Sequence, residues 1–173
     1  MSQKKCRWGI LGTAGIAQKN WQSIRNAGNA ELVAVGSRDV AKAQDFIDRC
    51  SAQVPHPVPP KAVGSYDEML ASDEIDAIYL PLPTGLRAQW AIKVAQAGKH
   101  LLCEKPCGTT LDELDDILAA CKEAGVQFMD GVMFMHPKPT GFISVSPIFL
   151  FFISTFPLKT CLYKKSFFIL VLN

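Results

Sequence analysis

The sequence predicts an α/β fold in which helices cover both faces of one doubly wound parallel sheet. Short apolar runs rich in β-branched residues alternate with longer stretches of helical period, as in parallel sheets covered by helices. The first apolar run, 7–11, also leads into a glycine-rich turn. The 173 residues suit one domain, or one domain with part of a second, and are few for two complete domains.

The expected elements alternate regularly along residues 1–131. The expected strands, in chain order, span residues 7–11, 32–35, 62–63, 76–80, 101–103 and 126–129. The expected helices span residues 14–26, 40–50, 67–70, 84–97 and 110–124. Strands joined by helices in this order complete one doubly wound domain by about residue 131.

Turn and cap residues define the limits of these elements. Four prolines in 54–60 exclude a helix and a central strand, so this segment is an extended surface loop. Ser65 caps the short third helix. Gly98 and Gly125 end the last two helices, because glycine adopts the left-handed conformation found after a helix.

The distribution of charge divides the chain near residue 139. All 16 acidic residues lie at or before Asp130, whereas 7 of the 10 phenylalanines lie after Thr140. Residues 1–139 hold 15 Lys and Arg against 16 acids, which is 15 − 16 = −1, and residues 140–173 hold three lysines without an acid. The first part forms no basic stripe, which argues against a nucleic-acid partner, and the overall composition excludes a disordered chain.

Cysteine and histidine spacing predicts no metal site. Six cysteines and three histidines are scattered, and no Cys-x-x-Cys occurs. The N-terminal residues run directly into the first strand without a cleavage signature, so we expect no signal peptide. Reduced thiols and a cytoplasmic location follow from that expectation.

The glycine-rich turn is a candidate dinucleotide site. From Gly12 the sequence reads G-x-A-x-x-A, with Ala14 and Ala17 where a dinucleotide fingerprint has glycines. Such a turn lets a pyrophosphate approach backbone N–H groups at a helix N-terminus. Taken alone, this degenerate pattern fits a plain tight turn equally well.

The end of the second strand carries residues that suit NADP. Ser37 and Arg38 follow Gly36, where a dinucleotide fold reads the adenosine ribose. An arginine and a hydroxyl group match a 2′-phosphate. Asp39 keeps NAD as an alternative, and its other interpretation is a cap of the next helix.

Two opposite charges, Glu104 and Lys105, follow the fifth strand and precede Pro106. Ligands bind at this edge of open α/β sheets, where a lysine can stabilise negative charge on a reacting oxygen and the neighbouring glutamate can help to hold it. The alternative is a surface ion pair, which the spacing alone slightly favours.

Three blocks together carry a family resemblance: WGILGTAGIA at 8–17, AVGSRD at 34–39, and YLPLPT at 79–84 running on to EKP at 104–106. The chain resembles the glucose-fructose oxidoreductase, inositol dehydrogenase and MocA (Gfo/Idh/MocA) family of NAD(P)-dependent oxidoreductases. It is most similar to the dihydrodiol dehydrogenase and xylose dehydrogenase branch, in which alanine at position 14 is common. The resemblance covers roughly residues 6–139.

The resemblance implies a Rossmann-type domain and a set of site residues. The implied cofactor contacts are Gly12, Thr13, Ala14, Gly15 and Ile16 to pyrophosphate, Ser37 and Arg38 to ribose or 2′-phosphate, Leu80, Pro81 and Thr84 along the end of the fourth strand, and Glu104 beside the nicotinamide. Lys105 is the implied catalytic residue, and the family often has a cis Lys-Pro bond after it. Where many relatives carry histidine after Thr84 this chain has Arg87, so no histidine role is carried over.

The resemblance also implies a division of the chain. Residues 1–131 are the expected NAD(P)-binding domain, 132–139 the start of the linker to the family's second α/β domain, and 140–173 a Phe-rich tail of non-family character. That second domain, which supplies a Tyr or His proton donor, is expected to be absent. The tail has three interpretations: a borderline membrane helix, a segment docked on the domain, or, as we favour, translated non-family sequence.

Two functions remain as hypotheses. The first is an oxidoreductase that exchanges hydride between NADP, or alternatively NAD, and a sugar, a cyclic polyol or a dihydrodiol. The second is a catalytically inactive NADP(H)-binding fragment, because the second domain closes over the cofactor in the family. A binding domain unrelated to redox chemistry is disfavoured by the Glu104–Pro106 motif. Substrate identity and oligomeric state are not defined by the sequence.

Overall fold

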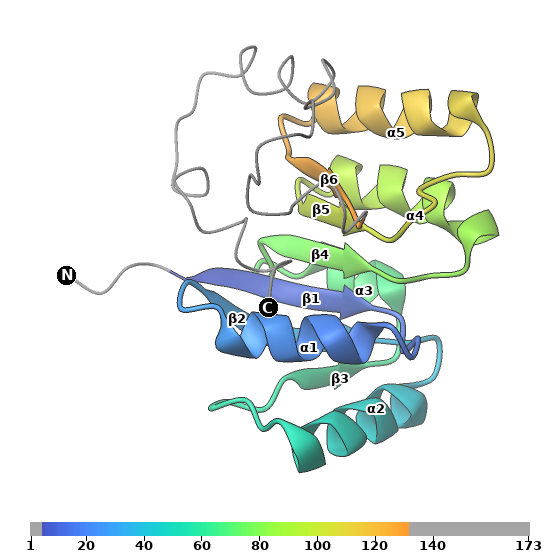
Figure 1. Cartoon of the computed structure of the whole chain (residues 1–173). Helices are drawn as coiled ribbons and strands as arrows, with labels where there is room; N and C mark the ends of the chain where they lie inside the picture. The colour runs from blue at the N-terminus through green and yellow to red at the C-terminus, as the bar shows by residue number, and fades with distance from the viewer. Residues whose placement is uncertain (1–4, 132–173) are drawn as a thin grey trace, which may run out of the picture.

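The computed structural model describes residues 5–131, which form a six-stranded sheet with the order β3-β2-β1-β4-β5-β6 (Figure 1). The strands are β1 (Cys6–Leu11), β2 (Ala30–Gly36), β3 (Lys61–Val63), β4 (Ala77–Leu80), β5 (His100–Cys103) and β6 (Phe128–Asp130). Every pairing between neighbouring strands is parallel. The predicted doubly wound parallel α/β sheet is therefore confirmed. The expected linker 132–139 and tail 140–173 lie outside the described residues.

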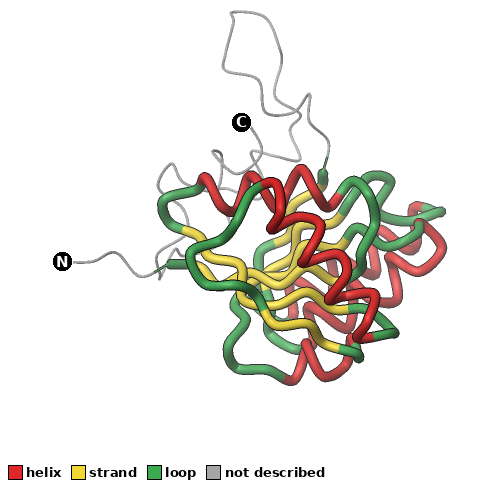
Figure 2. Tube along the Cα trace, turned by 90° about the horizontal axis from the view of Figure 1, so that it is seen from below, coloured by secondary structure: helices red, strands yellow, loops and turns green. Residues whose placement is uncertain are grey.

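Helices cover both faces of the sheet, as Figures 1 and 2 show. They are α1 (Ala17–Asn26), α2 (Val40–Gln53), α3 (Tyr66–Ala71), α4 (Thr84–Gln96) and α5 (Leu111–Glu123). Buried side chains of α1 and α2 form one core cluster with the sheet, and those of α3, α4 and α5 form the other. The chain therefore changes face after β3, as a doubly wound sheet requires.

Alternation along the central strands explains why their sequences are continuously apolar. In β4, Tyr79 points into the core under α1 and α2, whereas Ile78 and Leu80 point into the core under α3, α4 and α5. In β1, Ile10 and Leu11 divide in the same way. A strand that is buried on both faces needs apolar side chains at successive positions.

Polar caps begin three of the helices. Asp39 accepts a hydrogen bond from the backbone N–H of Ala41 at 2.9 Å, which confirms its interpretation as the cap of α2. Ser65 and Thr110 cap α3 and α5 in the same manner. Each cap satisfies an N–H group that has no partner within its helix.

Two expected helix limits were wrong by several residues. We expected the first helix from residue 14, but α1 begins at Ala17, because residues 14–16 form a tighter turn in which Ala17 N–H donates to the Ala14 carbonyl. The second helix continues to Gln53, beyond the expected 50, since nothing before the prolines interrupts it. No helix among the described residues is long and apolar enough to cross a membrane.

Candidate functional site

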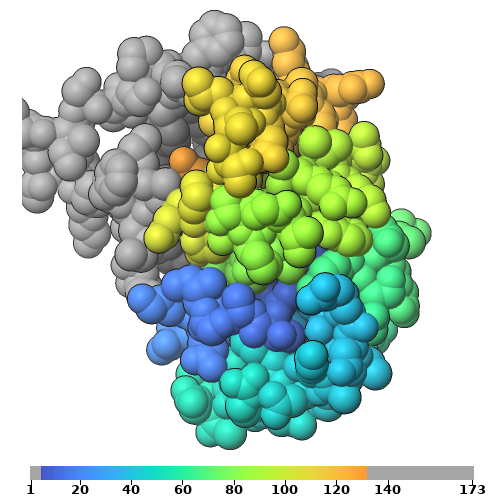
Figure 3. Space-filling model, turned by 90° about the vertical axis from the view of Figure 1, so that its right-hand side faces the viewer, coloured from blue at the N-terminus to red at the C-terminus, as the bar shows by residue number. Residues whose placement is uncertain are grey.

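The carboxyl ends of the strands bring most of the predicted site residues to one edge of the sheet. Residues 12–16 follow β1, residues 37–38 follow β2, residues 80–84 end β4, and residues 104–105 follow β5. The parallel strands all point toward this edge (Figure 1), and Figure 3 looks onto it. Strand order reverses between β1 and β4, which is where open α/β sheets form their ligand crevice.

Gly12 occupies a backbone position that requires glycine. Its φ angle is +117°, and its N–H donates to the carbonyl of Gly36 at 2.8 Å. A Cβ atom at position 12 would lie 2.8 Å from Leu82 Cδ2. The turn after β1 therefore sits against both β2 and the segment after β4.

The backbone beyond Gly12 presents N–H groups that lack acceptors within residues 5–131. None of the N–H groups of Thr13, Ala14, Gly15 and Ile16 donates to a described carbonyl or side chain. Ile16 begins α1 without a side-chain cap, and the first turn of α1 holds no acid. The helix dipole and these free N–H groups together favour an anion such as a pyrophosphate.

Arg38 is held beside the start of α3. Its guanidinium lies close enough to Tyr66 to lower the pKa of that phenol in part, although burial raises that pKa overall. Tyr66 itself packs edge-on against Trp90, with ring centroids 5.0 Å apart. Ser37 is buried, and its N–H donates to the carbonyl of Val63. Tyr66 was not predicted to be a site residue. The only indication in the sequence was its position on the apolar face of a short helix.

Glu104 is buried and held by two donors. Tyr79 Oη donates to Glu104 Oε1 at 2.8 Å, and the Lys105 backbone N–H donates to Glu104 Oε2 at 3.2 Å. Burial and the adjacent carboxylate raise the pKa of Tyr79 strongly, so the phenol keeps its proton and remains a donor. The carboxylate is thereby fixed at the end of β5, beside β4.

Lys105 is exposed, and its side chain forms no ion pair with another described residue. The surface ion pair between Glu104 and Lys105 that the spacing slightly favoured is therefore wrong, because Glu104 points inward to Tyr79. For the same reason Glu104 does not hold the lysine ammonium, although its carboxylate accepts from the lysine N–H. The bond between Lys105 and Pro106 is cis, as the resemblance implied.

Arg87 connects two of the loops at this edge. It is 9% exposed, its Nε donates to the carbonyl of Leu82 at 2.6 Å, and its Nη1 donates to the carbonyl of Pro106 at 2.6 Å. Nη1 also lies 3.3 Å from Thr84 Oγ1. The sequence predicted no role for Arg87. Its position was an indication of one, because many relatives have histidine there, three residues after Thr84.

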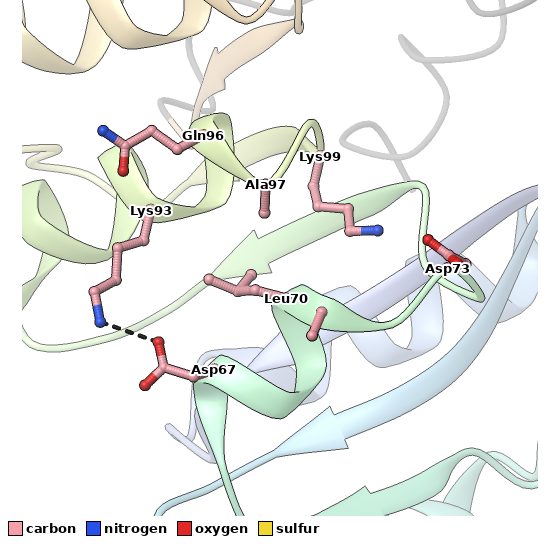
Figure 4. Close-up of a pocket in the computed structure, with 8 residues that line it drawn as sticks. Asp67, Leu70, Asp73, Lys93, Gln96, Ala97 and Lys99 are labelled. Carbon is pink, nitrogen blue, oxygen red and sulfur yellow. Dashed lines mark hydrogen bonds and ion pairs between the residues drawn. The ribbon is translucent and has the colours of Figure 1, made fainter.

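A surface hollow of about 490 Å³ lies away from this edge, beside the amino ends of β4 and β5 (Figure 4). It is lined by Asp67, Leu70, Ala71, Asp73, Lys93, Gln96, Ala97 and Lys99. Lys93 pairs with Asp67 at 3.0 Å, and Lys99 donates to the Ser72 carbonyl at 2.7 Å. Both ammonium groups are thus engaged within the protein. In residues 5–131, no three His, Cys, Asp or Glu side chains gather to hold a metal ion.

Comparisons with known proteins agree with this arrangement. Residues 6–132 match the family described as "Oxidoreductase family, NAD-binding Rossmann fold". A D-xylose 1-dehydrogenase (NADP(+)) of Haloferax volcanii is 41% identical over 131 residues, which are 75% of this chain and 38% of that enzyme.

Solved structures show the same relationship. KijD10, a 3-ketoreductase of Actinomadura kijaniata in complex with TDP-benzene and NADP, superposes with a TM-score of 0.70 at 31% identity, covering 78% of this chain and 40% of that one. The WlbA dehydrogenase of Bordetella pertussis, in complex with NADH and UDP-GlcNAcA, gives a TM-score of 0.63 at 30% identity, covering 75% and 37%. The chain thus spans about two fifths of the length of these relatives.

Proposed function

The chain belongs to the Gfo/Idh/MocA family of oxidoreductases with an NAD-binding Rossmann fold, and from this we propose that residues 5–131 bind NADP(H). The proposed reaction is hydride transfer between the nicotinamide and a sugar, a cyclic polyol or a dihydrodiol. A D-xylose dehydrogenase and a sugar 3-ketoreductase among the relatives support this substrate class. The proposed location is the cytoplasm.

One observation carries the proposal: an anion-accepting turn, an arginine and a lysine share one edge of the sheet. The free N–H groups of residues 13–16 fit a pyrophosphate, and the glycine conformation at Gly12 lets it approach the backbone. Glu104 and Lys105 follow β5, two strands from this turn in the sheet order. A dinucleotide that lies across the carboxyl edge reaches both.

A preference for NADP over NAD rests on the residues after β2. Arg38 is exposed and oriented by Tyr66, so its guanidinium is available to a 2′-phosphate. Asp39, the residue that kept NAD as an alternative, uses its carboxylate to cap α2. This engagement supports NADP as the cofactor, with NAD as the weaker ligand.

Lys105 is the proposed catalytic residue. The bound nicotinamide supplies the hydride chemistry, and the exposed lysine ammonium donates a hydrogen bond to the substrate oxygen, where negative charge develops. Glu104 holds the lysine backbone through its N–H group. Arg87 holds the same turn from the other side through the Pro106 carbonyl.

A second candidate function is NADP(H) binding without turnover. The described residues that support it are those of the cofactor site alone, namely the turn 13–16 and Arg38. Both candidates require cofactor binding, so the first experiment is a titration of NADPH fluorescence with the 173-residue chain. Assays with D-xylose and trans-dihydrodiols follow. We expect saturable binding; turnover at an ordinary enzymatic rate would select the first candidate, and binding without turnover would select the second.

Matched variants separate the parts of the proposal. Gly12→Ala, which forces a side chain into a positive φ against Leu82, should abolish NADPH binding, whereas Gly28→Ala, where a Cβ meets nothing within 4 Å, should not. Lys105→Ala should leave NADPH affinity nearly unchanged if the lysine acts on the substrate. A large loss of affinity in Lys105→Ala would instead make it a cofactor ligand.

A further inference from the structure

Two cysteines flank the turn formed by residues 104–106. Cys103 is the last residue of β5, is fully buried, and is aligned with Leu80 of β4 and Asp130 of β6. Cys107 follows the turn and is half-buried. Cys107 Sγ lies 4.0 Å from the Cys103 carbonyl oxygen, and Cys103 Sγ lies 3.6 Å from the Glu104 carbonyl oxygen. The turn therefore begins and ends on cysteines that are in contact with each other.

The two thiols differ in how readily they lose a proton. The adjacent Cys103 thiol lowers the pKa of Cys107, and Arg87 lowers it further, against opposing effects of burial, Asp130 and Glu104. The adjacent Cys107 thiol, together with burial, raises the pKa of Cys103 strongly. Cys107 is thus the thiol that ionises more readily and the one that solvent reaches. Thiolates are the nucleophilic and oxidisable form of cysteine.

The other described cysteines lack this combination. Cys6, Cys50 and Cys121 are all buried. Burial raises the pKa of Cys6 to about 12 and that of Cys121 to about 11. It also raises the pKa of Cys50. Among residues 5–131, oxidation is therefore directed to Cys107.

We propose that Cys103 and Cys107 are a redox-modification site, in which a hydroperoxide oxidises Cys107 and Cys103 then closes a reversible disulfide across the Glu104–Pro106 turn. In the first step the Cys107 thiolate attacks the peroxide, an S–O bond forms, the O–O bond breaks and hydroxide or alkoxide leaves. The sulfur loses two electrons and the peroxide gains them.

In the second step, the Cys103 sulfur attacks the sulfenic sulfur of Cys107. An S–S bond forms, the S–O bond breaks, and the departing hydroxide takes the Cys103 proton to leave as water. Both thiols are then consumed, and a dithiol reductant restores them. The contact between Cys107 Sγ and the Cys103 carbonyl oxygen holds the two residues side by side across the turn.

The disulfide changes the turn because only one of its ends can move freely. An S–S bond is about 2 Å long, shorter than any non-bonded contact between two sulfur atoms. Cys103 is fixed between two neighbouring strands, so Cys107 and the turn must move. We infer that the turn is displaced, including the candidate cofactor contact Glu104, and that NADPH is held less tightly. This functional consequence rests on the proposed function, whereas the disulfide itself does not.

Hydrogen peroxide added to the reduced full chain tests the bond. A protease that cuts after glutamate places Cys103 in fragment 75–104 and Cys107 in fragment 105–113, each without a second cysteine. We expect these fragments to be joined, about 2 Da lighter than their sum, and separated by dithiothreitol. Separate fragments after peroxide treatment, with Cys107 either unmodified or overoxidised, would overturn the inference.

Three variants assign the two roles. Cys103→Ser should leave a sulfenic acid on Cys107 that dimedone traps, and Cys107→Ser should leave Cys103 unmodified. Cys121→Ser, another buried cysteine, is the matched control and should form the disulfide as the unmodified chain does. Cys107 is half-buried, so Cys107→Ser remains informative if the buried Cys103→Ser does not fold.

NADPH titration of the reduced and oxidised chains tests the consequence. We expect the affinity for NADPH to fall about tenfold on oxidation and to return with dithiothreitol. In Cys107→Ser, peroxide should leave this affinity unchanged. Unchanged affinity in a chain with the disulfide would refute the displacement of the turn. A disulfide in a chain that never binds NADPH would instead leave the redox site standing and reject the proposed function.

Discussion

Arg87 donates a hydrogen bond to the carbonyl oxygen of Pro106 at 2.6 Å, although 19 positions separate the two residues in the sequence. The same guanidinium binds the carbonyl of Leu82, so one side chain joins the loop after β4 to the turn after β5. Both segments hold residues of the candidate cofactor site. The shape of that site therefore depends on Arg87, which is not one of the residues that the resemblance assigns to it.

Arg87→Met should destabilise the fold and loosen the turn that carries Lys105. Two carbonyl groups lose a charged donor, which costs about 3 kcal/mol in the free energy of unfolding. Urea unfolding measures this loss. The control is Arg49→Met, because Arg49 pairs with Asp45 at an exposed site and should change stability by less than about 1 kcal/mol. Equal effects of the two substitutions would contradict the role of Arg87.

Tyr79→Phe should leave a carboxylate oxygen of Glu104 without its buried donor. The expected loss is about 2 kcal/mol of unfolding free energy, with weaker NADPH binding because Glu104 is no longer fixed. Comparison with Glu104→Gln and the double variant isolates the pair. If the two losses simply add, the hydrogen bond does not couple these residues.

Arg38→Ala should reduce the affinity for NADPH about tenfold, equivalent to about 1.4 kcal/mol, and leave the affinity for NADH nearly unchanged. The reason is that only NADPH carries a 2′-phosphate. Fluorescence titrations with both cofactors measure the ratio. Tyr66→Phe should produce a smaller change in the same direction, since it removes the group that orients Arg38. A parallel loss for both cofactors would place Arg38 elsewhere in the site.

Stability should fall as the pH is lowered through about 6.5. Burial lowers the pKa of His56 below its ordinary value of 6.5, and burial also lowers that of His100. Between the lowered folded pKa and 6.5, the unfolded chain binds protons that the folded chain does not, so acid favours unfolding. Urea midpoints at pH 7.5 and 5.5 should show this decrease.

His56→Gln should reduce the difference between those two midpoints. His56 packs edge-on against Trp21, with ring centroids 4.7 Å apart, so the variant also loses some stability at pH 7.5. The informative quantity is therefore the pH-dependent part alone. An unchanged difference would show that His56 does not contribute to it.

The sheet was predictable because its strands have to be apolar on both faces. Tyr79 and Leu80 are neighbours in the sequence but pack into the cores on opposite faces of the sheet. Such strands therefore appear in the sequence as continuous apolar runs. Helix starts were less predictable where neither a polar cap nor a proline marks them. Asp39 marked the start of α2 correctly and Pro83 precedes the correctly predicted start of α4, whereas the start of α1 at Ala17, after an uncapped residue, was placed too early.

The candidate site was predictable in place but not in role. Gly12, Arg38 and Lys105 lie at one edge as expected, because strand ends meet there in a parallel sheet, whereas the roles predicted for Gly12 and Lys105 came from the family resemblance. The contacts that hold them come from Tyr66 and Arg87, which lie on helices and reach the site through side-chain length and direction. A linear pattern does not encode such contacts between distant segments.

The position of β1 has a consequence for the order in which the chain can fold during synthesis. Arg7 pairs with Asp76 at 2.7 Å across 69 positions, and β1 pairs with β4 as well as with β2. A nascent chain that has not yet extended past residue 80 carries the middle strand of its sheet with one hydrogen-bonding edge open. Until β4 leaves the ribosome, that edge is a template for wrong pairing that chaperones would have to cover.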